Sequence, residues 1–211
     1  MLEKEFDRQV ENALQKGYPN LRGIGREPFK KQIEPLKRRL GELIASTHET
    51  PKGPIPFVLV IKHELASAEA VMPLVEIKGV QGVVNMRPVT PSSFQPIEGM
   101  NLPKSMAYLL VDIDTGRETL NVTPSHALKI IQKANRSPLT IDEGIALILQ
   151  FPHILTDKKS YNCFSLLGSR RGDQRVPALW MSYGKPRLGW CWANNPHTWL
   201  GSASCRKRVG L

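Results

Sequence analysis

The sequence lacks any apolar run long enough to cross a membrane. Its longest purely apolar runs, Phe57–Ile61 and Ile145–Leu149, fall far short of the roughly 20 residues that a membrane-spanning helix needs. The N-terminal stretch Met1–Leu14 carries charges throughout and contains no apolar stretch typical of a secretion signal. We therefore expect a soluble, cytoplasmic protein without a membrane partner.

Cysteine is scarce as well, which argues against both a disulfide scaffold and a metal site. The chain has three cysteines, an odd number that predicts reduced thiols in a chain without an export signal. Cys163, Cys191, Cys205 and His197 are of zinc-ligating types, but no two cysteines have the close spacing that structural zinc sites usually contain. The stretch Gly168–Asp173 matches neither of the glycine-rich nucleotide-binding patterns. We expect no metal and no bound cofactor.

Acidic residues are nearly absent from the last quarter of the chain. Residues 161–211 contain eight Lys or Arg residues and one acid, Asp173, so this segment supplies +7 of the formal net charge of +10. The same segment holds all four tryptophans. Such an asymmetry is typical of a surface that meets an anionic partner. A basic face that only maintains solubility would give the same count.

Hydrophobic periodicity predicts two helices at the N-terminus. Apolar residues recur every four positions in residues 3–16, and a second apolar stripe runs through residues 28–46. Pro35 stands inside the second stripe and should kink or restart that helix, because proline lacks the amide hydrogen. The proline-rich stretch 48–56 is the best candidate for a linker.

The middle of the chain alternates predicted strands with helices. A buried strand is expected at 57–61 and a β-hairpin at 108–122, with Asp112 and Asp114 on the solvent face of that hairpin. Helix-capping signals open two further helices, at 124–135 and after Thr140.

The C-terminal part is predicted to be rich in strands. The expected strands cover residues 163–167, 176–183 and 188–193. The fold class is therefore α+β: an N-terminal helical hairpin in residues 1–50, followed by an α+β domain in residues 51–211. That domain contains antiparallel β-hairpins, a helical pair and the basic, tryptophan-rich segment.

The tryptophans admit two interpretations. Trp190 and Trp192 share one face of the last predicted strand and would offer flat rings on which nucleic-acid bases can stack. The favoured alternative is that Trp180, Trp190 and Trp192 fill the core of a small sheet, which is the most common role of an indole. Trp199 differs, because it lies in a polar loop and could line a pocket.

Two loops supply the candidate site residues. The loop around Gly168–Asp173 presents Arg170 and Arg171, and Arg175 follows it, so together they could hold a phosphate or a carboxylate. The other loop supplies hydrogen-bonding groups from Asn194, Asn195, His197 and Trp199. A turn whose Asn side chains bond to their own backbone is the alternative for this second loop. His197 with Cys191 or Cys205 forms a weaker catalytic candidate, which requires spatial proximity.

Long motifs in the second half of the chain resemble a bacterial protein family known only as a domain of unknown function. These motifs are Tyr108–Glu118, Leu139–Gly144, Cys163–Arg170, Arg175–Trp180, Leu188–Ala193 and Pro196–Gly201. The resemblance covers roughly residues 25–210. It implies a bacterial, cytoplasmic protein and brings no activity or catalytic residue with it.

Three hypotheses about function remain open. The leading one is a binding protein whose basic C-terminal segment engages an anionic partner, either nucleic acid or a phosphorylated or carboxylated small molecule. The second is a small-molecule enzyme with a pocket around His197, Asn194, Asn195 and a cysteine. The third is a protein-interaction module that uses the N-terminal helices as its partner surface.

Overall fold

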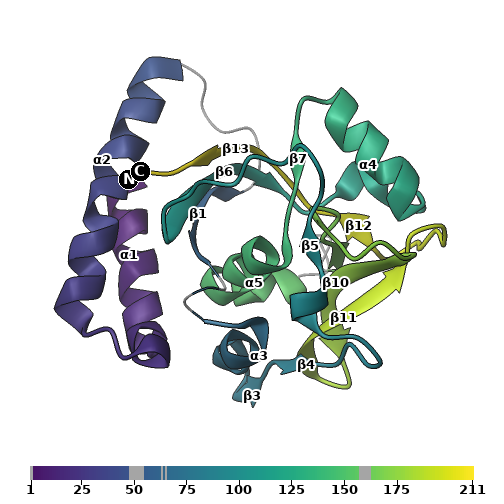
Figure 1. Cartoon of the computed structure of the whole chain (residues 1–211), viewed down its shortest axis with the longest axis horizontal. Coiled ribbons are helices and arrows are strands. Elements are labelled where there is room, and N and C mark those ends of the chain that lie inside the picture. The colour runs from purple at the N-terminus through teal and green to yellow at the C-terminus, as the bar shows by residue number, and fades with distance from the viewer. Residues whose placement is uncertain (1, 48–54, 63, 65, 157–162) are drawn as a thin grey trace.

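The computed structural model describes residues 2–47, 55–62, 64, 66–156 and 163–211, and it has an α+β fold (Figure 1). Helices α1 (Leu2–Gln15) and α2 (Arg26–Thr47) come first, and the C-terminal part is rich in strands. The predicted fold class is thus confirmed. Most of the predicted linker, residues 48–54, lies outside the described residues, and its last two residues open strand β1 (Ile55–Ile61).

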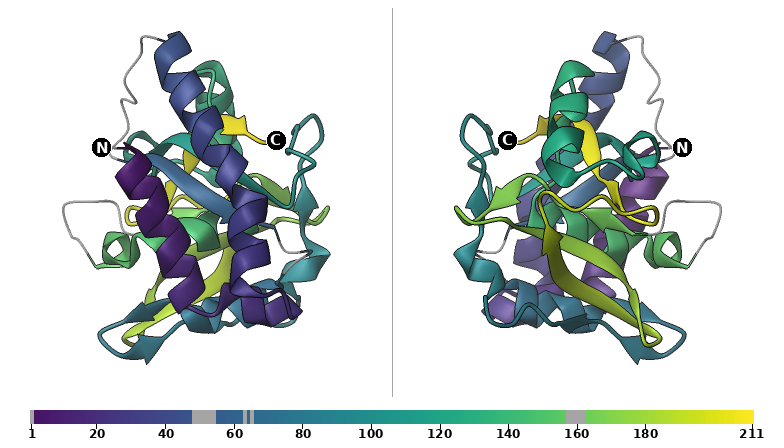
Figure 2. Two further views of the ribbon diagram at one scale, coloured as in Figure 1. Left: turned by 90° about the vertical axis from the view of Figure 1, so that its left-hand side faces the viewer. Right: turned by 90° about the vertical axis from the view of Figure 1, so that its right-hand side faces the viewer.

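The first sheet is antiparallel and joins strands from distant parts of the sequence, in the order β1-β6-β13-β7. Its other strands are β6 (Ala107–Asp114), β13 (Ser204–Val209) and β7 (Ser137–Pro138). Helices α1 and α2 cover one face of this sheet, and α5 (Ile141–Gln150) packs on the other (Figures 1 and 2). Burial on both faces explains why β1 is an uninterrupted apolar run after its first two residues.

Helix α1 is fastened to the open edge of β1 by Gln9, which is fully buried. The Gln9 Nε2 atom donates to the Phe57 carbonyl oxygen at 3.1 Å, and its Oε1 atom accepts from the Leu59 amide at 2.7 Å. Gln150 Nε2 donates to the carbonyl oxygen of Gln9 at 3.0 Å, which ties α1 to the end of α5. The apolar faces of α1 and α2 belong to the same hydrophobic core as the sheet.

Helix α2 continues through Pro35 as one element, so the predicted restart does not occur. Its inner face carries Phe29, Ile33 and Leu36, and all three side chains are buried against the core. Burying such side chains contributes roughly 1.5–3 kcal/mol each. That gain offsets the loss of about 3 kcal/mol that proline causes inside a helix.

The second sheet has the order β12-β8-β10-β11-β4 and contains Arg175, Lys185 and Arg187 of the basic segment. Its strands are β12 (Gly201–Ser202), β8 (Phe164–Ser165), β10 (Arg175–Ser182), β11 (Lys185–Trp192) and β4 (Val83–Val84). Strands β10 and β11 form a long antiparallel hairpin, and β4 pairs with β11 in parallel. Helix α4 (Pro124–Lys133) contributes Ala127 and Ile131 to a small cluster with Val176 of β10.

Short elements complete the described fold. They are α3 (Ala68–Val71), β2 (Glu76–Ile77), β3 (Val80–Gln81), β5 (Gln95–Pro96), β9 (Ser169–Arg170) and the 3₁₀ turns at Tyr18–Arg22, Met72–Leu74, Pro91–Ser93, Arg117–Thr119 and Pro152–Leu155. Residues 87–104, which contain four prolines, form only a 3₁₀ turn and the two-residue strand β5.

The predicted β-hairpin at 108–122 is wrong in its second half. Strand β6 ends at Asp114, and the chain then turns through Gly116 at φ 97° into a 3₁₀ turn. A Cβ atom at Gly116 would clash with the backbone of Ser202, so this glycine lets the loop pack directly under β12. The strands that pair with β6 are β1 and β13, and β13 was not predicted because its centre is the charged run Arg206–Arg208.

Asp112 is buried, contrary to the prediction that it faces solvent. Asp112 is only 2% exposed, and its carboxylate accepts hydrogen bonds from Arg136 and Arg206. The backbone at Asp112 adopts φ 58°, and its carbonyl oxygen accepts from Arg136 Nη2 at 2.6 Å. Two arginines therefore stabilise both a buried charge and a left-handed backbone conformation in the middle of a strand.

A buried ion pair locks α5 to the first sheet. Glu143 sits in the capping box that opens α5, as the sequence predicted, and is fully buried. Its carboxylate accepts from Arg208 Nε at 2.6 Å and Nη2 at 2.8 Å, and from the Tyr108 hydroxyl at 2.8 Å.

Across the part of the chain that the structure describes, no helix is both long and apolar enough to traverse a bilayer.

Candidate aromatic and basic binding site

The β10–β11 hairpin presents its tryptophans on both faces of the second sheet. The strand register pairs Arg175 with Trp192 and Pro177 with Trp190, which places both indoles on one face with Arg175. Trp180 and Cys191 point to the opposite face by the same alternation.

The prediction that these tryptophans fill the core is wrong for Trp180 and Trp192, whereas Trp190 packs, partly buried, against the main core. Trp180 and Trp190 are half-buried, and Trp192 is 42% exposed. Smaller side chains in the same hairpin, Val176, Leu179 and Leu188, are fully buried. They fill the interior, so the indoles lie at its margin.

The face that carries Trp190 and Trp192 is already covered by an arginine. The two rings meet edge to face with their centroids 4.8 Å apart, and the Arg175 Cζ atom lies 4.7 Å and 5.1 Å from those centroids. Arg175 is held there by Asp173, whose Oδ2 atom accepts from its Nη1 atom at 2.7 Å. A cation–π contact within the chain therefore covers part of the predicted stacking platform, as the Arg187 guanidinium covers part of Trp180.

An aromatic pocket of about 350 Å³ lies beside the hairpin, and all four tryptophans line it. Its other lining residues are Ala178 of β10, Cys191 of β11, and His197 and Leu200 from the loop that carries Trp199. The His197 ring centroid lies 5.3 Å from that of Trp199, and Trp199 lies 6.4 Å from Trp180. We call this feature the aromatic pocket. It brings together two of the predicted site residues, His197 and Trp199.

The loop that carries His197 and Trp199 is anchored at both of its sides. Ser125 Oγ donates to Asn194 Oδ1 at 3.0 Å, and Asn194 Nδ2 donates to Gln174 Oε1 at 3.1 Å. The Asn121 amide donates to the His197 carbonyl oxygen at 2.8 Å. Asn194 thus holds the loop in place, whereas the predicted site residue Asn195 is exposed and lies outside the pocket lining.

Three buried nitrogen atoms in and beside the pocket have no hydrogen-bond partner among the described residues. They are Arg175 Nε, whose guanidinium lies over Trp190 and Trp192, and His197 Nε2 and Arg187 Nε. The Arg187 Cζ atom lies 5.2 Å from the centroid of the Trp180 ring, so its guanidinium borders the pocket wall. A buried polar atom without a partner is costly, typically by about 1–3 kcal/mol. His197 Nε2 and Arg187 Nε are therefore each suited to form a hydrogen bond with a bound ligand.

The cysteines do not form an activated nucleophile. Cys191 lines the pocket beside His197, but burial raises the pKa of its thiol to about 12. Burial likewise raises the pKa of Cys205 to about 12, and that residue lies in β13 of the other sheet. Both thiols stay protonated at neutral pH, whereas a nucleophilic cysteine needs the thiolate. Among the residues that the structure covers, no group of three His, Cys, Asp or Glu side chains could hold a metal ion.

The basic residues of the last quarter divide into separate groups. Arg171 and Arg175 both pair with Asp173, and the Arg170 charge lowers the pKa of Cys191 against the larger effect of burial. In β13, Arg208 forms an ion pair with Glu143, and Arg206 forms one with Asp112. Part of the +7 charge is thus neutralised inside the fold.

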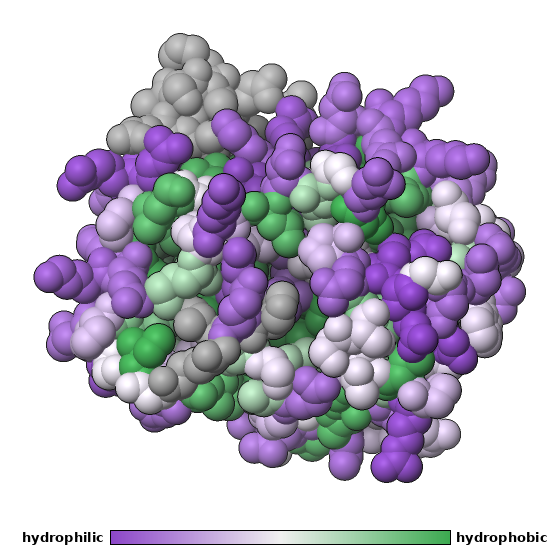
Figure 3. Space-filling view, in the orientation of Figure 1, coloured by the Kyte–Doolittle hydropathy of each residue, from purple (hydrophilic) through white to green (hydrophobic). Residues whose placement is uncertain are grey.

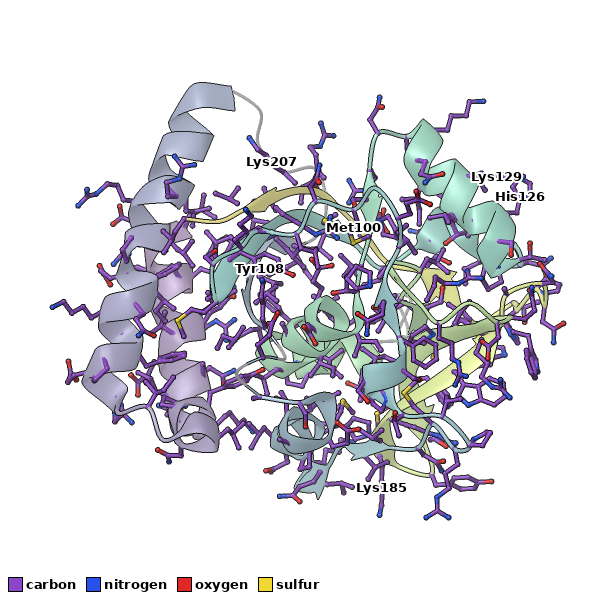
Figure 4. All side chains as sticks on the ribbon, in the orientation of Figure 1. Met100, Tyr108, His126, Lys129, Lys185 and Lys207 are labelled. Atoms are coloured by element: carbon purple, nitrogen blue, oxygen red, sulfur yellow. The ribbon has the colours of Figure 1, made fainter. Side chains whose placement is uncertain are left out.

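The remaining charges lie on different parts of the surface. Lys207 of β13 and Lys185 at the start of β11 lie at opposite ends of the molecule in Figure 4. Figure 3 shows hydrophilic side chains over α4 and along most of the outline of that face, with apolar side chains in small separate areas. No single continuous surface gathers all the predicted basic residues.

Comparison with known proteins assigns the chain to a family. The model of the family described as "Family of unknown function (DUF5701)" matches residues 12–211. The chain belongs to the DUF5701 family. No curated protein and no solved structure matches it.

The DUF5701 chain carries site residues that the sequence analysis did not select. Trp180 was assigned to the core, and the exposed residues Arg87 and Tyr183 were not considered. The pattern Tyr183-Gly184 between two strands was the available signal, because it marks the tip of a hairpin, where a tyrosine side chain is left exposed. The position of Arg87 depends on the parallel pairing of β4 with β11, which no local pattern reveals.

Proposed function

We propose that this protein binds an anionic ligand that carries a planar ring, of the nucleotide class, through the aromatic pocket. The observation that carries the proposal is the grouping of four indoles and an imidazole around one pocket, with the Arg187 guanidinium over Trp180 and unpartnered buried nitrogens on His197 and Arg187. Trp180 and Trp199 would stack on the ring, and Arg187 would contact the anionic group. We further propose a location in the bacterial cytoplasm, which suits a chain with three free cysteines.

The chemistry of the pocket supports a ring-bearing ligand over a bare anion. Ligand pockets are mostly apolar with a few polar groups that fix the orientation of the ligand. Here the walls are mostly aromatic and aliphatic, His197 supplies a polar group, and Arg187 borders the pocket over the Trp180 ring. Stacking of a base on an aromatic side chain is worth roughly 1–3 kcal/mol. An inorganic phosphate would gain none of that energy.

An enzyme based on His197 and a cysteine is the less favoured alternative. The pKa of Cys191 is raised by burial to about 12, so the thiol next to His197 is protonated at neutral pH. Nothing else in the described pocket is positioned as a nucleophile. Binding is therefore the function that the geometry supports best.

Calorimetric titration with nucleoside monophosphates tests the proposal. We expect saturable binding that is tighter than binding of the matching nucleoside or of inorganic phosphate. His197→Ala should weaken it about tenfold, because the ligand loses a hydrogen bond in a buried site. His126→Ala, at an exposed position on α4 (Figure 4), is the matched control and should change nothing. Equal binding of phosphate and monophosphate, or equal effects of both variants, would contradict the proposal.

A further inference from the structure

A second hollow lies at the edge of the second sheet, farther along the same hairpin as the aromatic pocket. It has a volume of about 700 Å³ and lies between the β4 segment and the tip of the β10–β11 hairpin. Arg87 lines it on the β4 side, and Tyr183, Lys185 and Arg187 line it on the hairpin side. We call this feature the basic hollow.

Arg187 connects the basic hollow to the aromatic pocket. Its side chain lines the hollow, and its guanidinium stacks over the Trp180 ring, which forms a wall of the pocket. Arg187 Nη1 donates to Ser182 Oγ at 3.3 Å, while Nε is buried and has no partner within the described part of the chain. One cation therefore stands between the two features and can serve a ligand that occupies both.

The basic hollow keeps most of its positive charge available. Arg87 and Lys185 are exposed, and neither has a carboxylate partner among the residues that the structure describes. Glu69 contributes the one carboxylate among the lining residues. Three cations thus face one anion, in contrast to Arg206 and Arg208, which are paired inside the fold.

Tyr183 at the hairpin tip has no packing role that explains it. Tyr183 is 99% exposed, and its backbone adopts φ 49°. A bulky residue in this conformation is strained, and turns of this kind favour Asn or Gly. A flat aromatic ring is thus held in solvent at an energetic cost, beside three cations.

From these contacts we propose that the ligand is single-stranded nucleic acid, which runs from the aromatic pocket across Arg187 into the basic hollow. This inference rests on the proposed function and names its ligand. One base stacks in the aromatic pocket, Arg187, Lys185 and Arg87 neutralise phosphates, and a second base stacks on Tyr183. Aromatic faces that alternate with cations along a groove are the arrangement by which proteins hold unpaired strands.

The length of the path favours a strand over a mononucleotide. Cys191 in the pocket and Lys185 at the hollow lie six positions apart along β11, which corresponds to about 20 Å of extended chain. A mononucleotide placed in the pocket would leave Lys185, Arg87 and Tyr183 without contact. A duplex would keep its bases stacked and unavailable to the indoles.

Fluorescence anisotropy with labelled oligothymidylates of one, two, four and ten nucleotides tests the inference. The full chain should bind the four-nucleotide probe at least tenfold more tightly than the one-nucleotide probe, with little further gain at ten. The matching RNA probe, a DNA duplex and a poly-glutamate peptide are run beside them. The duplex and the peptide should bind far more weakly, because neither offers unpaired bases.

Variants of the hollow separate this inference from the proposed function. Arg87→Gln and Lys185→Gln should each weaken binding of the four-nucleotide probe several-fold and reduce its salt dependence by about one phosphate contact. Neither should change binding of the one-nucleotide probe. Lys129→Gln on α4 and Lys207→Gln on β13 remove the same charge elsewhere (Figure 4) and serve as controls.

Tyr183→Asn supplies a test that unfolding cannot mimic. Asn tolerates the left-handed conformation, so the variant should be at least as thermally stable as the parent protein. It should nevertheless bind the four-nucleotide probe about tenfold more weakly, through the loss of one stacked base. A variant that binds as well as the parent would overturn the role of Tyr183.

The outcomes distinguish the two claims. Equal affinity for one and four nucleotides, with no effect of Lys185→Gln, overturns the strand proposal and leaves nucleotide binding in the aromatic pocket intact. Binding of poly-glutamate as tight as that of the oligonucleotide also overturns it, in favour of an acidic peptide. Absence of binding for every probe, the one-nucleotide probe included, overturns the proposed function itself.

Discussion

At the scale of single residues, the charged side chains of the C-terminal segment have opposite roles. Arg208 is buried with only 7% of its side chain exposed and neutralises Glu143, which is fully buried. Arg187 is half-buried over an indole and lacks a carboxylate partner in the described structure. Formal charge alone cannot separate these roles, because burial and pairing depend on residues that are distant in the sequence, such as Glu143.

The Glu143–Arg208 pair gives a prediction about stability. Glu143→Ala should destabilise the protein by about 3–5 kcal/mol, because Arg208 would remain buried without its partner. The double variant Glu143→Leu with Arg208→Met should recover much of that loss, since it removes both charges from the interior. Urea unfolding at pH 7 measures both. A single variant within 1 kcal/mol of the parent would show that the ion pair does not lock α5.

At the scale of elements, the N-terminal helices form part of the hydrophobic core. The buried residues Phe6, Val10, Phe29 and Ile33 lie in the same core cluster as β1. The Gln9 side chain satisfies the backbone edge of β1 at Phe57 and Leu59. The apolar faces that a protein-interaction module would offer to a partner are therefore occupied within the chain.

Deletion of residues 1–47 tests this assignment. We expect loss of cooperative unfolding, because the deletion exposes one face of the first sheet and leaves backbone groups of β1 unsatisfied. Circular dichroism during thermal denaturation measures the outcome, and a Lys4→Gln variant on α1 provides a folded control. A truncated chain that still unfolds cooperatively would support the alternative in which α1 and α2 are a separate partner surface.

The sequence allowed prediction of elements whose signals are local. The periodicity of α1, the capping box at Thr140 and the alternation in β11 all depend on neighbouring residues, and each is confirmed. β13 was missed, because its pairing with β6 arises from contacts almost one hundred residues apart. The aromatic pocket was only half predicted: the loop residues His197 and Trp199 were selected, whereas Trp180 reaches them only through the hairpin register.

At the scale of the whole molecule, buried ionisable groups make stability depend on alkaline pH. Burial raises the pKa of Cys191 and Cys205 to about 12, and burial followed by the nearby Glu143 raises the pKa of Tyr108. An unfolded cysteine has a pKa of about 8.5. Above that pH the unfolded chain loses protons that the native chain keeps, so the stabilising contribution present at neutral pH is lost as the pH rises.

The expected size of this effect is measurable. For each buried thiol, the free energy of unfolding should fall by about 1.4 kcal/mol per pH unit above about pH 9. Urea midpoints at pH 7.5, 9 and 10 give the slope. Cys205→Ala removes one titrating group and should flatten the decline relative to the parent at the same pH values. Parallel declines in parent and variant would contradict the assigned burial of Cys205.

The most direct test of the central claim is a titration of the full chain with a short single-stranded oligonucleotide, followed by tryptophan fluorescence at low and moderate salt. All four tryptophans lie in the basic segment, and Trp180 and Trp199 line the aromatic pocket. We predict saturable quenching that weakens steeply with salt and is diminished by Trp199→Ala. A signal that does not change at any salt concentration, together with unchanged calorimetric heats, would contradict the account.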